Sequence, residues 1–324
     1  MISSVAVIGT IFMDCKGFAS QKYNALGRNL GNIQFVHGGV GRNVAENLVN
    51  LQLPVLFVST FDKTAIGTEV IERLEKAGLD TKFLTGTETH GMGMWLAVLD
   101  HDGNLAGSIS QMPNLAILEE VISRKGQEIV TESTHIVLEL DLNERITRRV
   151  LSLAKASGRP VYGIPGNLDV ILKNQDILAD LACFICNDIE AERLLGVRFD
   201  DLGMEGLQKE LARFVEQTGM GSMVITLGSK GSVYYASQDK ESGYQPIFPV
   251  DLVDSSGAGD AFFSGTVMGL VRNRSLNQAV VYGTKVAAWT IQCHENNCLD
   301  LASRMEKDEL FCHVIARQQE KYVG

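Results

Sequence analysis

The stretch VAVIG, residues 5–9, is a short apolar run rich in β-branched residues and free of alternating polar positions. Similar runs occur at residues 54–60, 135–140, 159–164, 182–186 and 222–228. Each run is typical of a strand that is buried on both faces. Helical patterns separate them, for example at residues 42–51, 67–78, 143–158 and 206–219. This alternation predicts an α/β fold, with a doubly wound, mostly parallel sheet between two helical layers.

The composition excludes several classes of protein. The chain has 324 residues, of which 45% are apolar, and a formal net charge of −10 without a basic run. Nucleic acid and anionic membranes are therefore not expected as partners. We identify no apolar segment of the roughly 20 residues that cross a bilayer, and no signal peptide. The six cysteines are widely spread, which favours reduced thiols and a cytoplasmic location.

One region departs from the strand and helix alternation. Residues 91–110, GMGMWLAVLDHDGNLAGSIS, resemble two strands that meet at a turn around Asp102 and Gly103. We predict that segments at approximately 12–38 and 88–112 form a small β-sheet lid inserted in a single domain spanning residues 1–324. Because an exposed lid sheet can pair with a second subunit, a homodimer through the lid is a hypothesis.

The sequence GGVGRNVAENLVNL begins at Gly38 and places glycines at a helix start. With the acid Asp62, Gly39 and Gly41 form part of a dinucleotide-binding pattern, which favours a nucleotide-dependent oxidoreductase. The pattern is incomplete because valine replaces its third glycine. Alternatively, Gly38 and Gly39 let a small hydroxylated substrate approach the backbone while Asn43 hydrogen-bonds it. A third alternative is that the glycines only start the helix.

The sequence DSSGAGDAFFSG, residues 254–265, combines bare backbone with an acid. Gly257, Ala258 and Gly259 present N–H groups at the start of an apolar helix, where roughly half a positive charge favours a phosphate. A carboxylate at Asp260 would repel that phosphate. The presence of an acid here is explained if Asp260 accepts the proton of a hydroxyl that attacks the phosphate. On local grounds, Asp260 is equally well explained as a helix-capping acid.

These two stretches resemble the two signatures of the PfkB, or ribokinase-like, family of sugar and nucleoside kinases. The resemblance covers nearly the whole chain and includes VIGTIFMD (7–14), NDIEAERLLG (187–196) and ITLGSKGS (225–232). It implies a ribokinase-like fold and an enzyme that uses ATP and Mg²⁺ to phosphorylate a primary hydroxyl of a small molecule.

The resemblance also implies residue roles. Asp260 would be the catalytic base, and the anion hole would comprise Gly257, Ala258 and Gly259. Mg²⁺ would be organised, through water, by Asn187 and Glu190. Substrate hydroxyls would contact Asp14, Gly38, Gly39, Asn43 and Asp141. ATP would lie along Thr226, Gly228 and Gly231, and its adenine against residues 286–297, including Asn296. A monovalent cation such as K⁺, bound in some relatives, would contact Asp254 and Ser256.

Three segments are most similar to the pseudouridine kinase branch: GGVGRNVAENL, WLAVLDHDGNLAGSISQM and VAAWTIQCHENN. That branch would use the 5′-hydroxyl of the nucleoside as the attacking group. Ribose, fructose, inosine and cytidine are alternative acceptors, and a non-catalytic ligand sensor is an alternative function. GIPGN, from Gly163 to Asn167, departs from the pattern of many relatives, so phosphate contacts expected there have no match.

Cysteine spacing offers a second kind of site. Cys183 and Cys186 form a CxxC pair that Cys293 and Cys298 could complete as a zinc set. However, residues three apart in a strand point to opposite faces of the sheet. We therefore expect small buried thiols in place of a zinc site.

Overall fold

The computed structural model describes residues 3–311 except 141 and 167. Its main sheet has the strand order β13-β12-β11-β10-β9-β8-β1-β4-β5. The strands are β1 (Val5–Ile8), β4 (Val55–Asp62), β5 (Asp80–Thr87), β8 (His135–Glu139), β9 (Val161–Ile164), β10 (Cys183–Asn187), β11 (Ser222–Thr226), β12 (Ser232–Ala236) and β13 (Glu241–Gln245). In this order, all neighbouring strands from β11 through β1 to β5 pair in parallel. Strands β12 and β13 add an antiparallel edge. The predicted mostly parallel sheet is confirmed.

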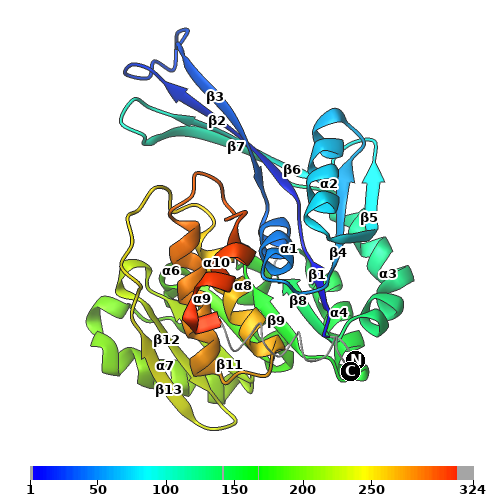
Figure 1. The fold of residues 1–324 in the computed structure, drawn as a ribbon, viewed down its shortest axis with the longest axis vertical. Coiled ribbons are helices and arrows are strands. Elements are labelled where there is room, and N and C mark those ends of the chain that lie inside the picture. The colour runs from blue at the N-terminus through cyan, green and yellow to red at the C-terminus, as the bar shows by residue number, and fades with distance from the viewer. Residues whose placement is uncertain (1–2, 141, 167, 312–324) are drawn as a thin grey trace.

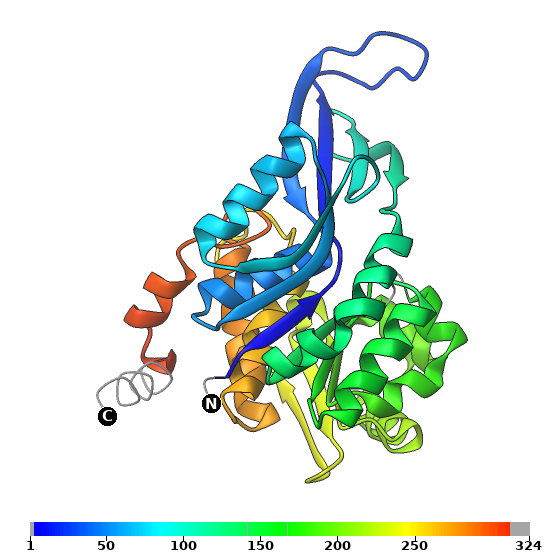
Figure 2. The same cartoon turned by 90° about the vertical axis from the view of Figure 1, so that its right-hand side faces the viewer.

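Helices cover both faces of this sheet, as Figure 2 shows with blue and orange helices on one side and green helices on the other. One layer contains α1 (Val40–Asn50), α2 (Ala65–Ala77), α8 (Ala258–Val271), α9 (Leu276–Thr290) and α10 (Leu301–Lys307). The other contains α3 (Leu115–Glu132), α4 (Glu144–Ala156), α5 (Asp169–Lys173), α6 (Asp188–Leu195) and α7 (Gly203–Thr218). Among the described helices, none has the length and apolarity to cross a membrane.

The two cores explain why the strands lack polar positions. In β1, Val5 and Val7 pack into one core, and Ala6 and Ile8 pack into the other. Successive side chains of a strand point to opposite faces, so a strand with a core on each side must be apolar throughout. These runs could therefore be predicted as buried strands from the sequence.

A smaller sheet stands above the body of the molecule (Figure 1). Its strands are β2 (Phe12–Ala19), β3 (Gly31–Gly38), β6 (Gly93–Leu99) and β7 (Leu105–Gln111), in the order β3-β2-β6-β7. The central pair β2 and β6 is parallel, and the two outer pairs are antiparallel. We call these four strands the lid sheet. Both segments expected to form a lid are therefore in one sheet, with the expected turn between β6 and β7.

The order of the main sheet fixes where a ligand can bind. β1 lies between β8 and β4, so the connections leaving β1 and β8 diverge across the sheet. Open α/β sheets bind ligands in the crevice outside the carboxyl ends of their strands at such a switch point. The chain segments after β1 and β8, and the helix starts facing them, are therefore the place to look for a site.

Candidate active site

A cleft of about 190 Å³ lies outside the carboxyl ends of β9, β10 and β11. It brings together five residues that the sequence predicted for one site: Asn187, Glu190, Thr226, Gly259 and Asp260. Pro165 and Gly166 also line it, so the segment that departs from the family pattern borders the cleft. These residues come from three distant parts of the chain, and the parallel sheet gathers them at one edge.

Asp260 lies half-buried in the first turn of α8. Its Oδ2 accepts a hydrogen bond of 2.7 Å from Nδ2 of Asn43. Burial raises the pKa of Asp260 to about 7, with a further upward contribution from Glu139, whereas the bond from Asn43 lowers the pKa. A carboxyl group with a pKa near neutral suits a general base.

The amide of Asn43 is held in one orientation by its neighbour. Arg42 donates hydrogen bonds to Oδ1 of Asn43, to Glu46 and to the carbonyl oxygens of His37 and Gly38. Because Arg42 occupies the oxygen of the Asn43 amide, the nitrogen faces Asp260. Arg42 and Glu46 are each only 1% exposed, and their role was not predicted from the sequence.

The helix start next to Asp260 has the backbone that the sequence predicted. Gly257 caps α8 with φ 76°, and a Cβ there would lie 2.0 Å from the carbonyl oxygen of Asn296. Only glycine fits this position. A Cβ on Gly259 would instead meet no atom within 4 Å, because Gly259 faces the cleft. We call residues 254–259 the anion loop.

The expected substrate contacts gather beside α1. Asp14 lies so close to Gly38 that a Cβ on Gly38 would be 2.9 Å from its carboxylate oxygens. Burial raises the pKa of Asp14, while the positive charges of Lys16 and Arg42 oppose this rise. Gly39 has φ 96°, and a Cβ there would lie 2.6 Å from the carbonyl oxygen of Thr10. The backbone that comes close to Gly39 is therefore the protein's own segment after β1. Asp141, the remaining expected contact, lies outside the described residues.

Glu139 is a site residue that sequence analysis missed. It ends β8 and is 8% exposed. Its carboxylate accepts hydrogen bonds from the amides of Thr10 and Gly41 and from the Thr10 hydroxyl. Glu139 thereby joins the segment after β1 to the start of α1. A charged residue near the end of the apolar run HIVLEL was the available signal.

Asn187 and Glu190 form a capping box at the start of α6. Oδ1 of Asn187 accepts the amide of Glu190 at 2.8 Å, and Oε2 of Glu190 accepts the amide of Asn187 at 2.9 Å. The pair therefore has a structural role, and both residues also line the cleft. Carboxylate and amide oxygens are suitable donors for a hydrated Mg²⁺, so the residues present fit that ion.

The residues expected along ATP are divided between the cleft and its surroundings. Thr226 lines the cleft, whereas Gly228 is exposed with φ 56°. Gly231 has φ 90°, and a Cβ there would lie 2.3 Å from the carbonyl oxygen of Gln245, so glycine is needed for strand packing. Asn296 donates its amide to the carbonyl oxygen of His37 at 3.2 Å. The structure therefore gives Asn296 a contact between the lid sheet and the anion loop.

Asp254 and Ser256 form a turn at the start of the anion loop. Oδ1 of Asp254 accepts the amide of Ser256 at 2.8 Å. Burial alone would raise the pKa of Asp254, but hydrogen bonds from Ser256 outweigh it and the pKa is lowered. Asp254 is therefore an ionised carboxylate beside the loop.

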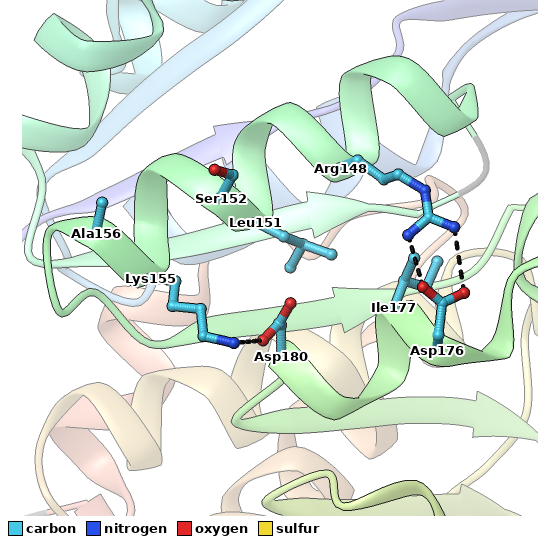
Figure 3. A pocket seen from close by; sticks show the side chains of 8 residues that line it. All are labelled: Arg148, Leu151, Ser152, Lys155, Ala156, Asp176, Ile177 and Asp180. Carbon is cyan, nitrogen blue, oxygen red and sulfur yellow. Dashed lines mark hydrogen bonds and ion pairs between the residues drawn. The ribbon is translucent and has the colours of Figure 1, made fainter.

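Other features noted in the sequence lie outside the cleft. Oδ1 of Asp62 accepts the amide of Gly91 at 2.6 Å, which gives the acid of the apparent dinucleotide pattern a structural role. Cys183 and Cys186 pack into opposite cores, as expected. A surface groove of about 470 Å³ lies between α4 and η1 (Gln175–Asp180), and two basic side chains line it (Figure 3). Arg148 forms an ion pair with Asp176, and Lys155 forms one with Asp180. The positive charges of both side chains are therefore already neutralised by carboxylates and do not make an anion site.

The fold is a doubly wound α/β fold with a cleft outside the carboxyl ends of its central strands. Residues 2–300 match the pfkB family of carbohydrate kinases, and the chain belongs to that family, which is a family of phosphotransferases. A guanosine-inosine kinase from Exiguobacterium acetylicum is 36% identical over 297 residues, which cover 91% of this chain and 96% of that protein. A pseudouridine kinase from Escherichia coli is 26% identical, covering 92% and 93% of the two chains.

A solved structure supports the fold assignment. The ribokinase of Arabidopsis thaliana, solved with ribose and ATP, superposes with a TM-score of 0.81 at 21% identity, covering 95% of this chain and 100% of that chain. The expected ribokinase-like fold is thus confirmed, and family membership confirms the expected kinase class. The oxidoreductase alternative was wrong, because the family to which residues 2–300 belong is one of phosphotransferases.

Proposed function

We propose that the protein transfers the γ-phosphoryl group of ATP to the 5′-hydroxyl of a nucleoside. The observation that carries this proposal is the pairing of Asp260, whose pKa is about 7, with the open backbone at Gly259 in one cleft. A base beside an anion-binding helix start suits a reaction in which a hydroxyl attacks a phosphate.

The chemistry assigns one task to each part of the site. Asp260 accepts the proton of the acceptor hydroxyl as the new oxygen to phosphorus bond forms and the bond from the γ-phosphorus to ADP breaks. The amides of Gly257, Ala258 and Gly259 stabilise the charge on the transferring group. Asn43 and Arg42 hold the Asp260 carboxylate in place through the hydrogen bonds described above.

Two cations enter as parts of the same proposal. Mg²⁺ would neutralise phosphate charge, and Asn187 and Glu190 would hold its water shell. A monovalent cation such as K⁺ would lie near Asp254 and Ser256, where the ionised Asp254 carboxylate supports it. The described cysteines are free thiols, which is consistent with the reducing cytoplasm in which we place the reaction.

We favour a purine nucleoside as the acceptor. The 36% identical protein is a guanosine-inosine kinase, so we put guanosine and inosine before pseudouridine, which the sequence alone favoured. The lid sheet supports a nucleoside over a free sugar. Trp95 on β6 is directly opposite Asp14 on β2, so both side chains are on the same face of the sheet. An indole ring beside the sugar contact can stack on a base.

An acceptor panel tests the proposal. Purified protein, ATP and Mg²⁺ would be incubated with guanosine, inosine, pseudouridine, uridine, cytidine, adenosine, ribose or fructose, and the products identified by mass spectrometry. We expect nucleoside 5′-monophosphates, with guanosine and inosine turned over fastest. Preference for ribose or fructose would refute the nucleoside assignment while keeping the phosphotransferase, and ligand binding without any product would favour a sensor.

Trp95→Ala distinguishes base stacking from lid packing. Loss of stacking should raise KM for the nucleoside at least about fivefold, since base stacking contributes on the order of 1–3 kcal/mol. If an alternative sugar such as ribose is turned over slowly, its KM should remain unchanged. An equal rise in KM for both acceptors would show that Trp95 acts only on lid structure.

A further inference from the structure

The segment that joins α9 to α10 contains a second cluster of chemically active side chains. The Sγ atoms of Cys293 and Cys298 and a carboxylate oxygen of Asp300 all lie within 4.8 Å of one another. Cys298 is buried, Cys293 is half-buried and Asp300 is exposed. Sγ of Cys298 donates a hydrogen bond of 2.9 Å to Oδ1 of Asp300. We call these three residues the thiol cluster.

We propose that the thiol cluster is a binding site for a soft divalent cation of the Zn²⁺ class. Thiolate and carboxylate oxygen are Zn²⁺ ligands, and tetrahedral geometry with bonds of about 2.3 Å to sulfur places two sulfurs about 3.7 Å apart. The three donor atoms lie within 4.8 Å of one another, so small side-chain shifts would bring them to one ion. Binding replaces the protons of the two thiols, which pass to solvent, and a water molecule completes the fourth position.

Neighbouring groups orient the donors from the outside. Nε of Arg304 donates to Oδ1 of Asp300 at 2.9 Å, and its NH1 group donates to Oε1 of Gln292 at 3.4 Å. Sγ of Cys293 donates to the carbonyl oxygen of Trp289 at 3.5 Å. Carboxylates that bind metals are themselves hydrogen-bonded by outer groups, and such groups fix the orientation of the ligand.

The thiol cluster differs from the other candidate metal sites in the described part of the chain. Asp100, His101 and Asp102 form the second group with suitable spacing, but they lie at the exposed turn of the lid sheet. There, Oδ1 of Asp100 accepts the amides of Asp102 and Asn104 and so shapes the turn. The thiol cluster also differs from the proposed Mg²⁺ position, because thiolates select Zn²⁺ and disfavour Mg²⁺.

The location of the cluster gives a bound cation a structural consequence. Cys293 and Cys298 flank a short stretch that contacts both the anion loop and α1. The carbonyl oxygen of Asn296 lies against Gly257 in the anion loop, and Nδ2 of Asn297 donates to the carbonyl oxygen of Asn43 at 2.8 Å. A cation joining the two cysteines would therefore fix both ends of the stretch that supports the anion loop and α1.

Spectroscopy with Co²⁺ tests the site without reference to activity. The full-length protein, reduced and treated with a chelator, would be titrated with Co²⁺ and followed for the thiolate charge-transfer band and the visible bands of tetrahedral Co²⁺. We expect one equivalent to bind and Zn²⁺ to abolish both signals by displacing it. Asp300→Asn should weaken Co²⁺ binding, because a neutral amide oxygen replaces a charged carboxylate ligand.

Serine variants identify the ligands. Cys293→Ser and Cys298→Ser should lose the charge-transfer band, whereas the control Cys15→Ser, in strand β2 of the lid sheet, should keep it. Because Cys298 is fully buried, the half-buried Cys293 supplies the variant that is expected to fold, with circular dichroism as the check. Zn²⁺ should raise the melting temperature of the wild type but not of Cys293→Ser. A wild type without the band, or a band retained in Cys293→Ser, would overturn the proposal.

Discussion

At the scale of single residues, two opposing effects set the pKa of the Asp260 carboxyl group. Burial and the charge of Glu139 raise its pKa, while the hydrogen bond from Asn43 lowers it. The result, about 7, leaves the group partly ionised at neutral pH. Such a group can accept a proton during the reaction without being held permanently as a strong anion beside a phosphate.

The pH dependence of kcat/KM should report this balance. If the ionised Asp260 is the base, kcat/KM falls about tenfold per pH unit below pH 7 and levels above it. Asn43→Ala removes the bond that lowers the pKa, so the inflection should move to higher pH. Initial rates across the pH range measure both effects, and an inflection that stays in place in Asn43→Ala would show that Asn43 does not tune the base.

The same pKa predicts how stability depends on pH. The pKa of Asp260 is raised from an ordinary value of 3.8 to about 7, so between these values the folded state holds a proton that the unfolded state has lost. Stability therefore falls as pH rises through this window. Asp260→Asn removes the effect and should raise the free energy of unfolding above pH 7 by up to about 4 kcal/mol.

Urea unfolding at acid and alkaline pH measures this difference. The gain in Asp260→Asn should vanish below about pH 3, where the carboxyl group is protonated in both the folded and the unfolded state. Glu144→Gln, which removes an acid from the first turn of α4, is the control for a change in helix charge. An equal gain in Asp260→Asn at both pH values would rule out titration of Asp260 as the cause.

The residues around Asp260 differ in whether their roles could be predicted from the sequence. That Asp260 and Gly259 lie together at a helix start could be predicted, because their spacing along the chain is short and specific. Arg42 and Glu139 could not, since their roles depend on burial and on contacts across the fold. Glu139 accepts hydrogen bonds from Thr10 and Gly41, which are 129 and 98 positions away in the sequence.

At the scale of elements, the start of α8 separates a folding requirement from a functional one. Gly257 needs its positive φ and has no space for a side chain, because the Asn296 carbonyl lies against it. Gly259 has space for a Cβ, and that space is the cleft itself. The two glycines of one loop are therefore expected to respond differently to the same substitution.

Gly259→Ala should preserve the fold and abolish most activity. The added methyl group meets no protein atom within 4 Å, but it occupies the place where we expect the phosphate to approach the backbone. The melting temperature should match the wild type, while kcat/KM falls at least about 100-fold. Gly107→Ala, on β7 and equally uncrowded, is the matched control. Normal activity in Gly259→Ala would move the anion hole elsewhere.

Strands differ in how well they can be predicted from their sequences. The central strands could be predicted because cores on both faces demand continuous apolar runs. The edge strands β5 and β13 were missed because most of their side chains are not buried. Only Phe83 is buried in β5, and β13 has the polar sequence ESGYQ. Their pairing is set by neighbouring strands, which a local pattern does not contain.

At the scale of the whole molecule, the two faces of the lid sheet are chemically different. One face has Asp14 directly opposite Trp95, toward the proposed substrate. Strand register places Phe35, Cys15, Leu96 and Ile109 side by side on the other face. Phe35 is 61% exposed and Ile109 is 67% exposed. Exposed apolar stripes of this kind favour association with another surface.

We propose that two copies of the chain pair through this apolar stripe. Ile109→Lys places a charge in the stripe, so the protein should change from dimer to monomer in light scattering at a concentration where the wild type is a dimer. Leu26→Lys changes a residue that is 99% exposed and outside the four strands, and should leave the dimer intact. A monomeric wild type at every working concentration would contradict the proposal.

Above all, we propose that Asp260 takes the proton of a nucleoside hydroxyl during phosphoryl transfer. The most direct measurement compares the turnover of ATP and guanosine by wild type and Asp260→Asn, with Glu144→Gln as the control. We predict that Asp260→Asn folds and loses about 10²- to 10⁴-fold in kcat, as expected for a missing general base, while Glu144→Gln matches the wild type. A folded Asp260→Asn with wild-type turnover would contradict the account.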